Sequence, residues 1–213
     1  MYNKYMPTKK HLHFNDIAPD LELMSSTGNP ISLSDLWSEK TLLLAFLRHF
    51  GCPQCKEMLA ELAQYQPDLD KVQIALAVVT QDSPAETSVF CEQYAPNVLC
   101  LSDPERAAYR AFGLGRGSFR QTVLSPRVWR ANRLVKQRRG WKPEMPPSGQ
   151  DAFQMSGIFI IGTDGRVRLP YYYEDIADHP PLDLLMFGVM GKDWSSPFEG
   201  PILKNTGGTL SQS

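Results

Sequence analysis

Two cysteines three positions apart, Cys52 and Cys55, stand between an apolar run and a helical pattern. The run, residues 41–47, is almost entirely apolar, as expected of a central parallel strand that is covered on both faces. From residue 53 to about residue 65, apolar side chains recur at helical spacing. Pro53 suits the first position of this helix, because the amide hydrogen that proline lacks would have no partner there. The sequence therefore predicts a buried strand that ends at a redox pair of cysteines, followed directly by a helix.

The positions of the two thiols assign them different roles. Cys52 falls at the N-cap of the predicted helix, where unsatisfied amide groups and the positive end of the helix dipole favour a thiolate. In such settings the pKa of a thiol falls from near 8.5 to roughly 3.5 to 7.5, so we predict that Cys52 is the nucleophile. Cys55 points back toward the same end of the helix and is less exposed. We predict that Cys55 resolves a mixed disulfide or a sulfenic acid on Cys52.

Length and composition predict one globular core. A chain of 213 residues with 42% hydrophobic content can bury a single sizeable core with one added subdomain. No run approaches the roughly 18 apolar residues of a membrane span, and residues 1–13 carry lysines without the apolar segment of a secretory signal. Four cysteines are too few for a disulfide scaffold in a chain of this length. We therefore expect a cytoplasmic protein, in which a Cys-x-x-Cys pair is catalytic or binds metal.

Strand-like and helix-like segments alternate along the chain. A short strand at residues 31–33 and a helical turn from Ser34 precede the strand that leads to the cysteine pair. The other predicted elements, in order, are a strand at 72–80, a helix at 83–94, a strand at 97–102, a helix at 104–112, a hairpin at 158–161 and 167–172, and a helix at 181–190. This order predicts an α/β fold with a central mixed sheet flanked by helices. We expect residues 1–190 to form one domain and residues 191–213 a polar tail.

A basic insertion separates the predicted helix at 104–112 from the hairpin. Residues 106–142 hold eleven of the 22 lysines and arginines and no acidic residue, although the net charge of the whole chain is −1. The insertion, about residues 114–154, contains a helix that begins at Ser125 and has two distinct sides. The apolar side carries Val128, Ala131 and Val135, and the basic side carries Arg130, Arg133 and Lys136. Such a helix either packs on the core with a solvated basic face or binds an acidic protein, an anionic membrane or nucleic acid. The simplest function of the basic face is to steer an acidic partner or substrate toward the cysteines.

The remaining cysteines and two histidines have simpler interpretations. Cys91 lies in a predicted helix and Cys100 in a predicted strand, each beside apolar residues, so we interpret both as small buried apolar side chains. His11 and His13 could complete a zinc site with the cysteine pair, since two thiolates and two imidazoles are a recognised ligand set. Their order differs from that of common zinc fingers, and we expect neither a metal ion nor a cofactor.

Four short segments occur in an order and at a spacing that are specific when taken together. They are residues 18–23 (Ala-Pro-Asp-Leu-Glu-Leu), residues 47–55 (Leu-Arg-His-Phe-Gly-Cys-Pro-Gln-Cys), residues 101–104 with 111–113 (Leu-Ser-Asp-Pro and Ala-Phe-Gly), and residues 157–167. Through them the chain resembles the peroxiredoxin-like proteins of the AhpC/TSA antioxidant family, in the branch of peroxiredoxin-like 2 and the selenoprotein L-related redox proteins. The resemblance implies a thioredoxin-like fold, into which the basic helical insertion is placed before the C-terminal hairpin, and a thiol-dependent redox activity.

The sequence departs from the better-known patterns of this superfamily. Typical peroxiredoxins have a proline seven residues and a threonine or serine three residues before the reactive cysteine, and an arginine just before the later strand. Here these positions hold Ala45, His49 and Ser156. Thioredoxins have a cis-proline opposite the dithiol, where this chain has Met155, Ser156 and Gly157. The resemblance alone therefore does not provide a typical peroxide-binding site.

Arg48 and His49 are the predicted substitutes for the missing residues. A guanidinium beside Cys52 would stabilise its thiolate and bind an anionic leaving group, and a histidine there could transfer protons. The alternative for Arg48 is that it only solvates the end of the strand. The predicted catalytic residues are Cys52, Cys55, Arg48 and His49.

Two classes of function agree with these features. In the first, a thiol oxidoreductase, Cys52 attacks a peroxide or a protein disulfide, Cys55 closes a redox-active disulfide, and the thioredoxin or glutathione system reduces it again. In the second, a thioredoxin-fold binding, assembly or regulatory factor uses the dithiol as a redox sensor and the basic insertion as a partner surface. The intact cysteine pair favours the enzyme, whereas the missing peroxide-positioning residues favour the binding factor. The tail can dock on the body, dock on a second subunit as in a homodimer, or stay disordered.

Overall fold

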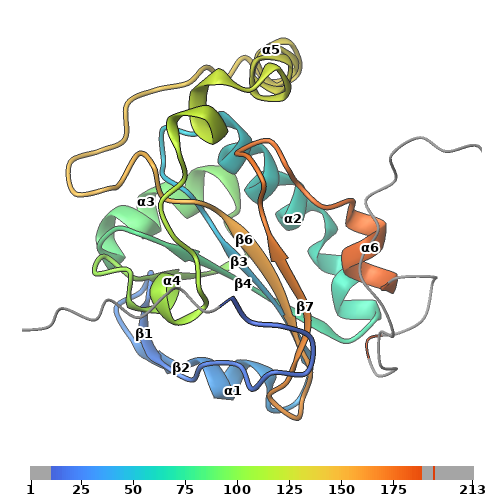
Figure 1. Cartoon of the computed structure of the whole chain (residues 1–213). Coiled ribbons are helices and arrows are strands. Elements are labelled where there is room, and N and C mark those ends of the chain that lie inside the picture. Colours follow the sequence, from blue (N-terminus) through green and yellow to red (C-terminus); the bar gives the residue numbers. More distant parts are fainter. Residues whose placement is uncertain (1–10, 189–193, 195–213) are drawn as a thin grey trace, which may run out of the picture.

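A seven-stranded mixed sheet forms the centre of the computed structural model, which describes residues 11–188 and Trp194. The strand order is β2-β1-β5-β4-β3-β6-β7, in which β3, β4 and β5 run parallel and the other neighbours are antiparallel. The strands are β1 (Glu22–Ser25), β2 (Pro30–Ser32), β3 (Thr41–Phe46), β4 (Ile74–Thr80), β5 (Leu99–Ser102), β6 (Gly157–Ile161) and β7 (Val167–Tyr172). The strand that leads to the cysteine pair, β3, lies in the interior of the sheet between β4 and β6 (Figure 1).

Helices cover both faces of the sheet, because the side chains of its central strands alternate between two apolar layers. On β3, Leu43 and Ala45 belong to one layer, whereas Leu42, Leu44 and Phe46 belong to the other. The first layer is covered by α2 (Pro53–Lys71), α3 (Pro84–Tyr94) and α6 (Leu182–Phe187), and the second by α1 (Leu33–Trp37) and α4 (Ala107–Ala111). The predicted α/β fold, a central mixed sheet flanked by helices, is confirmed (Figure 1).

The boundaries of two helices differ from the predicted ones, and one strand was not predicted. α2 continues through Pro67 to Lys71 instead of ending near residue 65, because the fully buried Leu69 holds its last turns on the core. α4 begins only at Ala107, because Arg106 before it has a left-handed backbone and the Asp103 carboxylate accepts hydrogen bonds from the amides of Ala107 and Ala108, each at 2.8 Å. The strand without a predicted counterpart is β1, which pairs with β2 and β5.

The predicted basic helix is present as α5 (Pro126–Arg139), and a short π-helix, η1 (Arg120–Leu124), precedes it. Ser125 is the N-cap of α5, and Val128 and Val135 of the predicted apolar side are buried. The predicted basic side is exposed; it consists of Arg130, Arg133 and Lys136. α5 packs against α2, and the chain then returns to β6 through a long loop (Figure 1). The insertion therefore lies at the end of the sheet where β3 delivers the cysteine pair.

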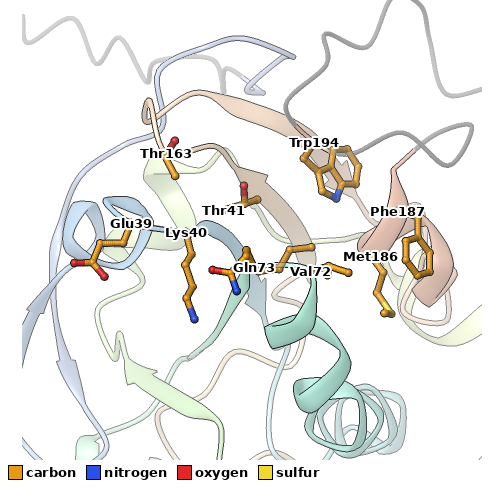
Figure 2. Close-up of a pocket in the computed structure, with 10 residues that line it drawn as sticks. Glu39, Lys40, Thr41, Val72, Gln73, Thr163, Met186, Phe187 and Trp194 are labelled. Atoms are coloured by element: carbon orange, nitrogen blue, oxygen red, sulfur yellow. The ribbon is translucent and has the colours of Figure 1, made fainter.

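The opposite end of the sheet carries α6 and a pocket of about 370 Å³. Figure 2 shows Thr41, at the start of β3, on one side of this pocket and Met186, Phe187 and Trp194 on another. The indole N–H of Trp194 donates to the carbonyl of Leu185 at 2.9 Å. Because the pocket lies where β3 begins and the cysteine pair follows the point where β3 ends, this cavity is separate from the thiol site.

Several predictions fall on residues that the structure does not describe. They concern the lysines within residues 1–10 and the tail at 191–213 apart from Trp194. The helix predicted at 181–190 is shorter than expected, because α6 ends at Phe187 and Gly188 follows as its C-cap with a positive φ. In the described part of the chain, no helix is both long and apolar enough to cross a membrane.

Candidate active site

The cysteine pair occupies the turn between β3 and α2 and the first turn of that helix. Cys52 is the N-cap of α2, with an extended backbone, and Pro53 takes the first helical position, as predicted. A hydrogen bond from the Cys52 amide to the His49 carbonyl, at 3.1 Å, closes the turn before the helix. Both cysteines are free thiols, and only 1% of Cys52 and 2% of Cys55 is exposed. The two sulfurs thus lie below the surface, close enough to share a hydrogen bond.

The two thiols have opposite electrostatic environments. The hydrogen bond from the Cys55 thiol lowers the pKa of Cys52, and the charge of Arg48 lowers it further, against burial, which raises it. Burial raises the pKa of Cys55 well above its usual value, and the bond to Cys52 adds to this effect. Cys52 is therefore the thiolate of the pair, and Cys55 keeps its proton. The helix N-terminus contributes through the Cys55 amide, but less than the Cys55 thiol and Arg48 contribute.

Arg48 lies next to Cys52 and is 8% exposed. Its backbone amide donates to the Cys55 sulfur at 3.3 Å, so the residue contacts the environment of both thiols. Nη2 of its guanidinium donates to the carbonyl of Ala152 in the insertion. Nε has no hydrogen-bond partner among the described residues, and the side chain lines the cavity in front of Cys52. A charged group beside Cys52 thus has one buried donor without a hydrogen-bond partner among the described residues.

His49 lies in the same turn but has a neutral ring. Its Nδ1 accepts a hydrogen bond from the Gly51 amide at 3.1 Å. Burial, reinforced by the charge of Arg48, lowers the pKa of His49 to about 3. A ring in this state cannot serve as a cationic proton donor at neutral pH. Its visible role is to hold the turn that presents Cys52.

The hairpin side of the dithiol carries further polar groups. Ser156 stands where thioredoxins have their cis-proline, and its Oγ lies 4.0 Å from the Cys55 sulfur. No peptide bond in the described ranges is cis, so a hydroxyl replaces the proline at this position. The Tyr173 hydroxyl lies 2.9 Å from Sδ of Met58 and 3.0 Å from Nδ1 of His179. His179 therefore packs beside the first turns of α2, a position that the sequence did not indicate.

The insertion covers Cys52 and encloses a pocket of about 300 Å³ in front of it. One wall is formed by the turn and helix start that carry Cys52, with Arg48, His49, Gly51, Pro53 and Gln54. The opposite wall comes from the insertion, with Thr122, Val123, Val128, Trp129, Asn132, Pro143, Glu144, Met145, Pro146 and Ala152. The predicted insertion is therefore part of the thiol site and not a separate appendage.

Close backbone contacts hold the insertion against the turn that carries Cys52. The Glu144 amide donates to the Gly51 carbonyl at 2.9 Å, and a Cβ atom on Gly51 would collide with the Glu144 carbonyl oxygen. The Glu144 carboxylate pairs with Lys56, in the first turn of α2, at 2.8 Å. The Phe50 amide donates to the side chain of Gln150 at 2.8 Å. A glycine is thus required beside Cys52 for the insertion to pack this closely.

Four amide side chains complete the site, and sequence reasoning missed all of them. Gln54, inside the cysteine motif, donates to Asn132 of α5. Gln81, which follows β4, donates to the carbonyl of Arg48, and Gln150 binds the turn as described above. Amide side chains carry no chemical signal of their own, and these residues are far apart in the sequence, so spacing could not reveal their meeting.

The interpretation of Cys91 and Cys100 as two separate apolar side chains is wrong. Both are buried, as expected, but they form a disulfide that joins α3 to β5. The pairing arises because α3 ends close to β5 and a short connection brings the two elements side by side. In the sequence, only the even number of cysteines pointed to a disulfide.

His11 and His13 have local partners. The ring of His11 stacks on Tyr172 with centroids 4.1 Å apart, and Nδ1 of His13 lies 3.7 Å from the Asp16 carboxylate. Within residues 11–188 and Trp194, no three histidine, cysteine or acidic side chains gather as ligands for a metal ion.

Comparison with known proteins gives the site a context. The chain matches the AhpC/TSA family over residues 14–169. It is 28% identical over 185 residues to Peroxiredoxin-like 2C of Bos taurus, covering 83% of this chain and 81% of that protein. It is 27% identical over 180 residues to Thioredoxin-like protein AAED1, chloroplastic, of Arabidopsis thaliana, covering 80% of this chain and 71% of that protein.

Solved structures share the fold. The crystal structure of peroxidoxin BcpB from Mycobacterium tuberculosis matches with a TM-score of 0.58 and 21% sequence identity, covering 78% of this chain and 90% of that chain. At this identity the likeness concerns the thioredoxin-type arrangement of sheet and helices. It agrees with the order of strands and helices described above.

Proposed function

This chain belongs to the AhpC/TSA family, and from that membership we propose that it is a thiol peroxidase with Cys52 as its nucleophile and Cys55 as its resolving thiol. Its broader class, a thiol-dependent oxidoreductase of the peroxiredoxin-like kind, follows from the family itself. One observation supports a peroxide over a protein disulfide as the substrate. Cys52 is 1% exposed and faces a pocket of about 300 Å³, which a small peroxide can enter without contacting the outer surface, whereas the sulfur of a folded protein must pass the exposed side chains of the insertion to reach Cys52.

The proposed reaction uses the two thiols in sequence. The Cys52 thiolate attacks one peroxide oxygen, the O–O bond breaks, and Cys52 becomes a sulfenic acid while the other oxygen leaves and takes up a proton. The Cys55 sulfur then attacks the Cys52 sulfur. The sulfenic hydroxyl leaves as water with the proton of the Cys55 thiol, and a disulfide forms. The high pKa of Cys55 suits this order, because the thiol keeps its proton until the second step.

In this proposal, Arg48 and His49 act in different ways. The guanidinium of Arg48 stabilises the Cys52 thiolate and, through its unpaired Nε, the oxygen that leaves. His49 holds the turn by accepting from the Gly51 amide. Arg48 is therefore a catalytic residue, and His49 is a positioning residue.

We also propose a reductant, a cellular compartment and an oligomeric state for the enzyme. The thioredoxin or glutathione system reduces the disulfide, and the compartment is the cytoplasm, where the protein has an antioxidant role. The Cys91–Cys100 disulfide is unusual in that compartment. Thiol trapping in cell extracts would test both the compartment and the presence of this disulfide in cells.

Residues 1–190 act as one domain, and the tail at 191–213 joins two subunits in a homodimer. Light scattering of the full chain and of a chain without the tail would test this.

A second function has an observation in its favour. The protein could be a redox-sensing binding or assembly factor, because the basic side of α5 is exposed while both thiols are buried. Such a factor would oxidise slowly and would not turn over. Kinetics of oxidation therefore separate the two functions.

The test is single-turnover oxidation of the reduced protein by one equivalent of hydrogen peroxide. Tryptophan fluorescence can report the reaction, because Trp129 lines the pocket that contains Cys52. We expect oxidation about 10²-fold or more faster than that of free cysteine, the factor that one well-placed stabilising group contributes. Mass spectrometry should find a Cys52–Cys55 disulfide in the wild type and a Cys52 sulfenic acid in Cys55→Ser.

The matched variant is Cys52→Ser, which keeps Cys55 in place and should not react. Oxidation of the wild type at the rate of a free thiol would rule out the peroxidase. A disulfide that joins Cys52 to Cys91 or Cys100, in place of Cys55, would rule out the resolving role assigned to Cys55.

A further inference from the structure

Large apolar side chains are exposed around the pocket that contains Cys52. Val123 of η1, Trp129 of α5 and Met145 of the following loop line that pocket, and their exposed fractions are 40%, 59% and 87%. We call these three residues the rim patch. The indole N–H of Trp129 donates to the Val123 carbonyl at 2.6 Å, so the largest side chain of the patch is held in place. A fixed, exposed tryptophan surrounded by other apolar groups is typical of the centre of a protein interface.

A basic stripe lies beside the rim patch. Arg133 and Lys136 follow Trp129 at four and seven positions along α5, so all three lie on one side of the helix. Arg133 and Lys136 are exposed and form no ion pair with any residue that the structure describes. We call these two residues the basic stripe.

Two other arginines of α5, Arg127 and Arg138, are already partnered. Arg127 pairs with Asp175 and Asp178, which lie after β7, and Arg138 pairs with Glu57 of α2. The charge of the stripe is therefore available to a partner, whereas the charges of Arg127 and Arg138 are paired within the protein.

The proposed peroxidase cycle, on which this inference rests, requires a reductant to reach the oxidised pair. Cys52 lines the pocket, and Cys55 does not, so an incoming thiolate reaches the sulfur of Cys52. The path to that sulfur passes the rim patch. A protein reductant must therefore contact this surface while its thiol enters.

We propose that the rim patch and the basic stripe are the docking surface of the reductant, an acidic protein with a dithiol and an apolar patch beside it. The apolar centre would exclude water around the entering thiol, and the positive stripe would steer and orient an acidic surface. The patch is confined to residues of η1, α5 and the loop after it, so the insertion provides the specificity for the reductant.

The reduction step balances with this partner alone. A thiolate of the partner attacks the Cys52 sulfur, the Cys52–Cys55 bond breaks, and Cys55 leaves as a thiolate that takes up a proton. The Arg48 amide, which donates to the Cys55 sulfur, would stabilise this leaving group. The second thiolate of the partner attacks its own first sulfur in the mixed disulfide and releases Cys52 as a thiolate. Two electrons pass to this chain, and the partner ends as a disulfide.

The experiment measures re-reduction of the oxidised full chain in a stopped-flow instrument. Diamide prepares the Cys52–Cys55 disulfide, so the test does not depend on peroxidase activity. The reductants are a thioredoxin of net negative charge and, as a small uncharged control, dithiothreitol. The variant is Arg133→Glu with Lys136→Glu, and the matched control is Lys40→Glu with Lys71→Glu, which makes the same change in charge near the far end of the sheet.

We expect the stripe variant to be reduced by thioredoxin at least about tenfold more slowly than wild type in low salt, the lower limit of electrostatic steering. This difference should shrink when the ionic strength rises from about 0.02 to about 0.3 M, because salt screens exposed charges. Reduction by dithiothreitol should be unchanged, as should every rate of the control variant. Trp129→Ala should slow reduction by thioredoxin at both salt concentrations, because its contribution is apolar.

Two results would overturn the proposal. One is an unchanged thioredoxin rate in the stripe variant; if that variant also loses binding to phosphatidylserine vesicles, the surface belongs to an anionic membrane. The other is an equal loss in the control variant. Failure of peroxide oxidation, by contrast, would refute the proposed peroxidase and leave the diamide-based docking result intact.

Discussion

At the scale of single residues, two neighbours lower the pKa of Cys52. The hydrogen bond from Cys55 and the charge of Arg48 lower the pKa of Cys52 to about 6, against burial, which raises it. Because the folded-state pKa is lowered, the thiolate is present above about pH 6 and is lost as the pH falls through that value. The thiolate therefore dominates at neutral pH without any help from His49.

Removal of the guanidinium tests this account. We expect Arg48→Met to raise the pKa of Cys52 by about one to two units, the usual effect of a nearby opposite charge. The measurement is the rate of alkylation of Cys52 by iodoacetamide between about pH 4 and pH 10, a range that covers both expected midpoints. Arg48→Lys is the control, since it keeps the charge and should move the midpoint less. Equal midpoints in wild type and Arg48→Met would show that Cys55 alone determines the pKa of Cys52.

The residues that could be predicted from the sequence are those that are contiguous in it. Arg48, Cys52 and Cys55 lie within one turn and helix start, so a strand followed by a helix already brings them together. Asn132 and Gln150 lie far along the chain, and their place at the site depends on how the insertion folds back. Such long-range contacts cannot be predicted from the spacing and type of residues.

At the scale of elements, the disulfide between α3 and β5 is the main covalent constraint. It closes a short loop between Cys91 and Cys100, and a loop of about ten residues removes roughly 2–3 kcal/mol of chain entropy from the unfolded state. We therefore expect Cys91→Ala with Cys100→Ala to lower the free energy of unfolding by about that amount. Urea denaturation followed by circular dichroism measures the change.

A reducing agent provides the control for that prediction. Wild-type protein treated with a phosphine reductant should lose a similar free energy of unfolding, because Cys52 and Cys55 are already thiols and only the second pair changes. A denaturation midpoint that does not respond to the reductant, in protein whose disulfide is shown to be reduced, would contradict the stabilising role.

Elements whose sequence shows both a characteristic start residue and a regular apolar pattern could be predicted, and elements with only one of these features could not. α5 had both a helix start at Ser125 and a side of regularly spaced valines, and the structure contains it. β1 spans four residues, of which only Leu23 and Ser25 are buried, so its apolar pattern is too short to recognise. α4 starts late because Arg106 has a left-handed backbone and the Asp103 carboxylate caps the amides that follow it, and both effects depend on single residues.

At the scale of the whole molecule, the insertion determines access to the thiols. The sequence predicted its position, its helix and its charge, but not that it packs on Cys52. That contact requires a glycine at residue 51 and the Lys56–Glu144 ion pair, and neither feature stands out in a sequence. The thioredoxin-type core thus presents a dithiol that the insertion then covers.

A side chain at residue 51 should displace the insertion from the turn that carries Cys52. In Gly51→Ala the new Cβ atom would collide with backbone atoms of Glu144 and Met145, which cannot rotate away. Overpacking of this kind costs about 1–3 kcal/mol, and about 1.4 kcal/mol corresponds to a tenfold shift in an equilibrium. We expect Cys52 to be alkylated by a bulky maleimide about tenfold faster than in wild type, with α2 and the sheet still folded by circular dichroism.

Lys56→Met, which removes the ion pair with Glu144, should act in the same direction. Lys71→Met removes an ion pair with Asp68 farther along the same helix and should leave the rate unchanged. A folded Gly51→Ala protein with the wild-type alkylation rate would mean that the insertion does not limit access to Cys52, and the preference for a small peroxide over a protein disulfide would then lose its physical basis.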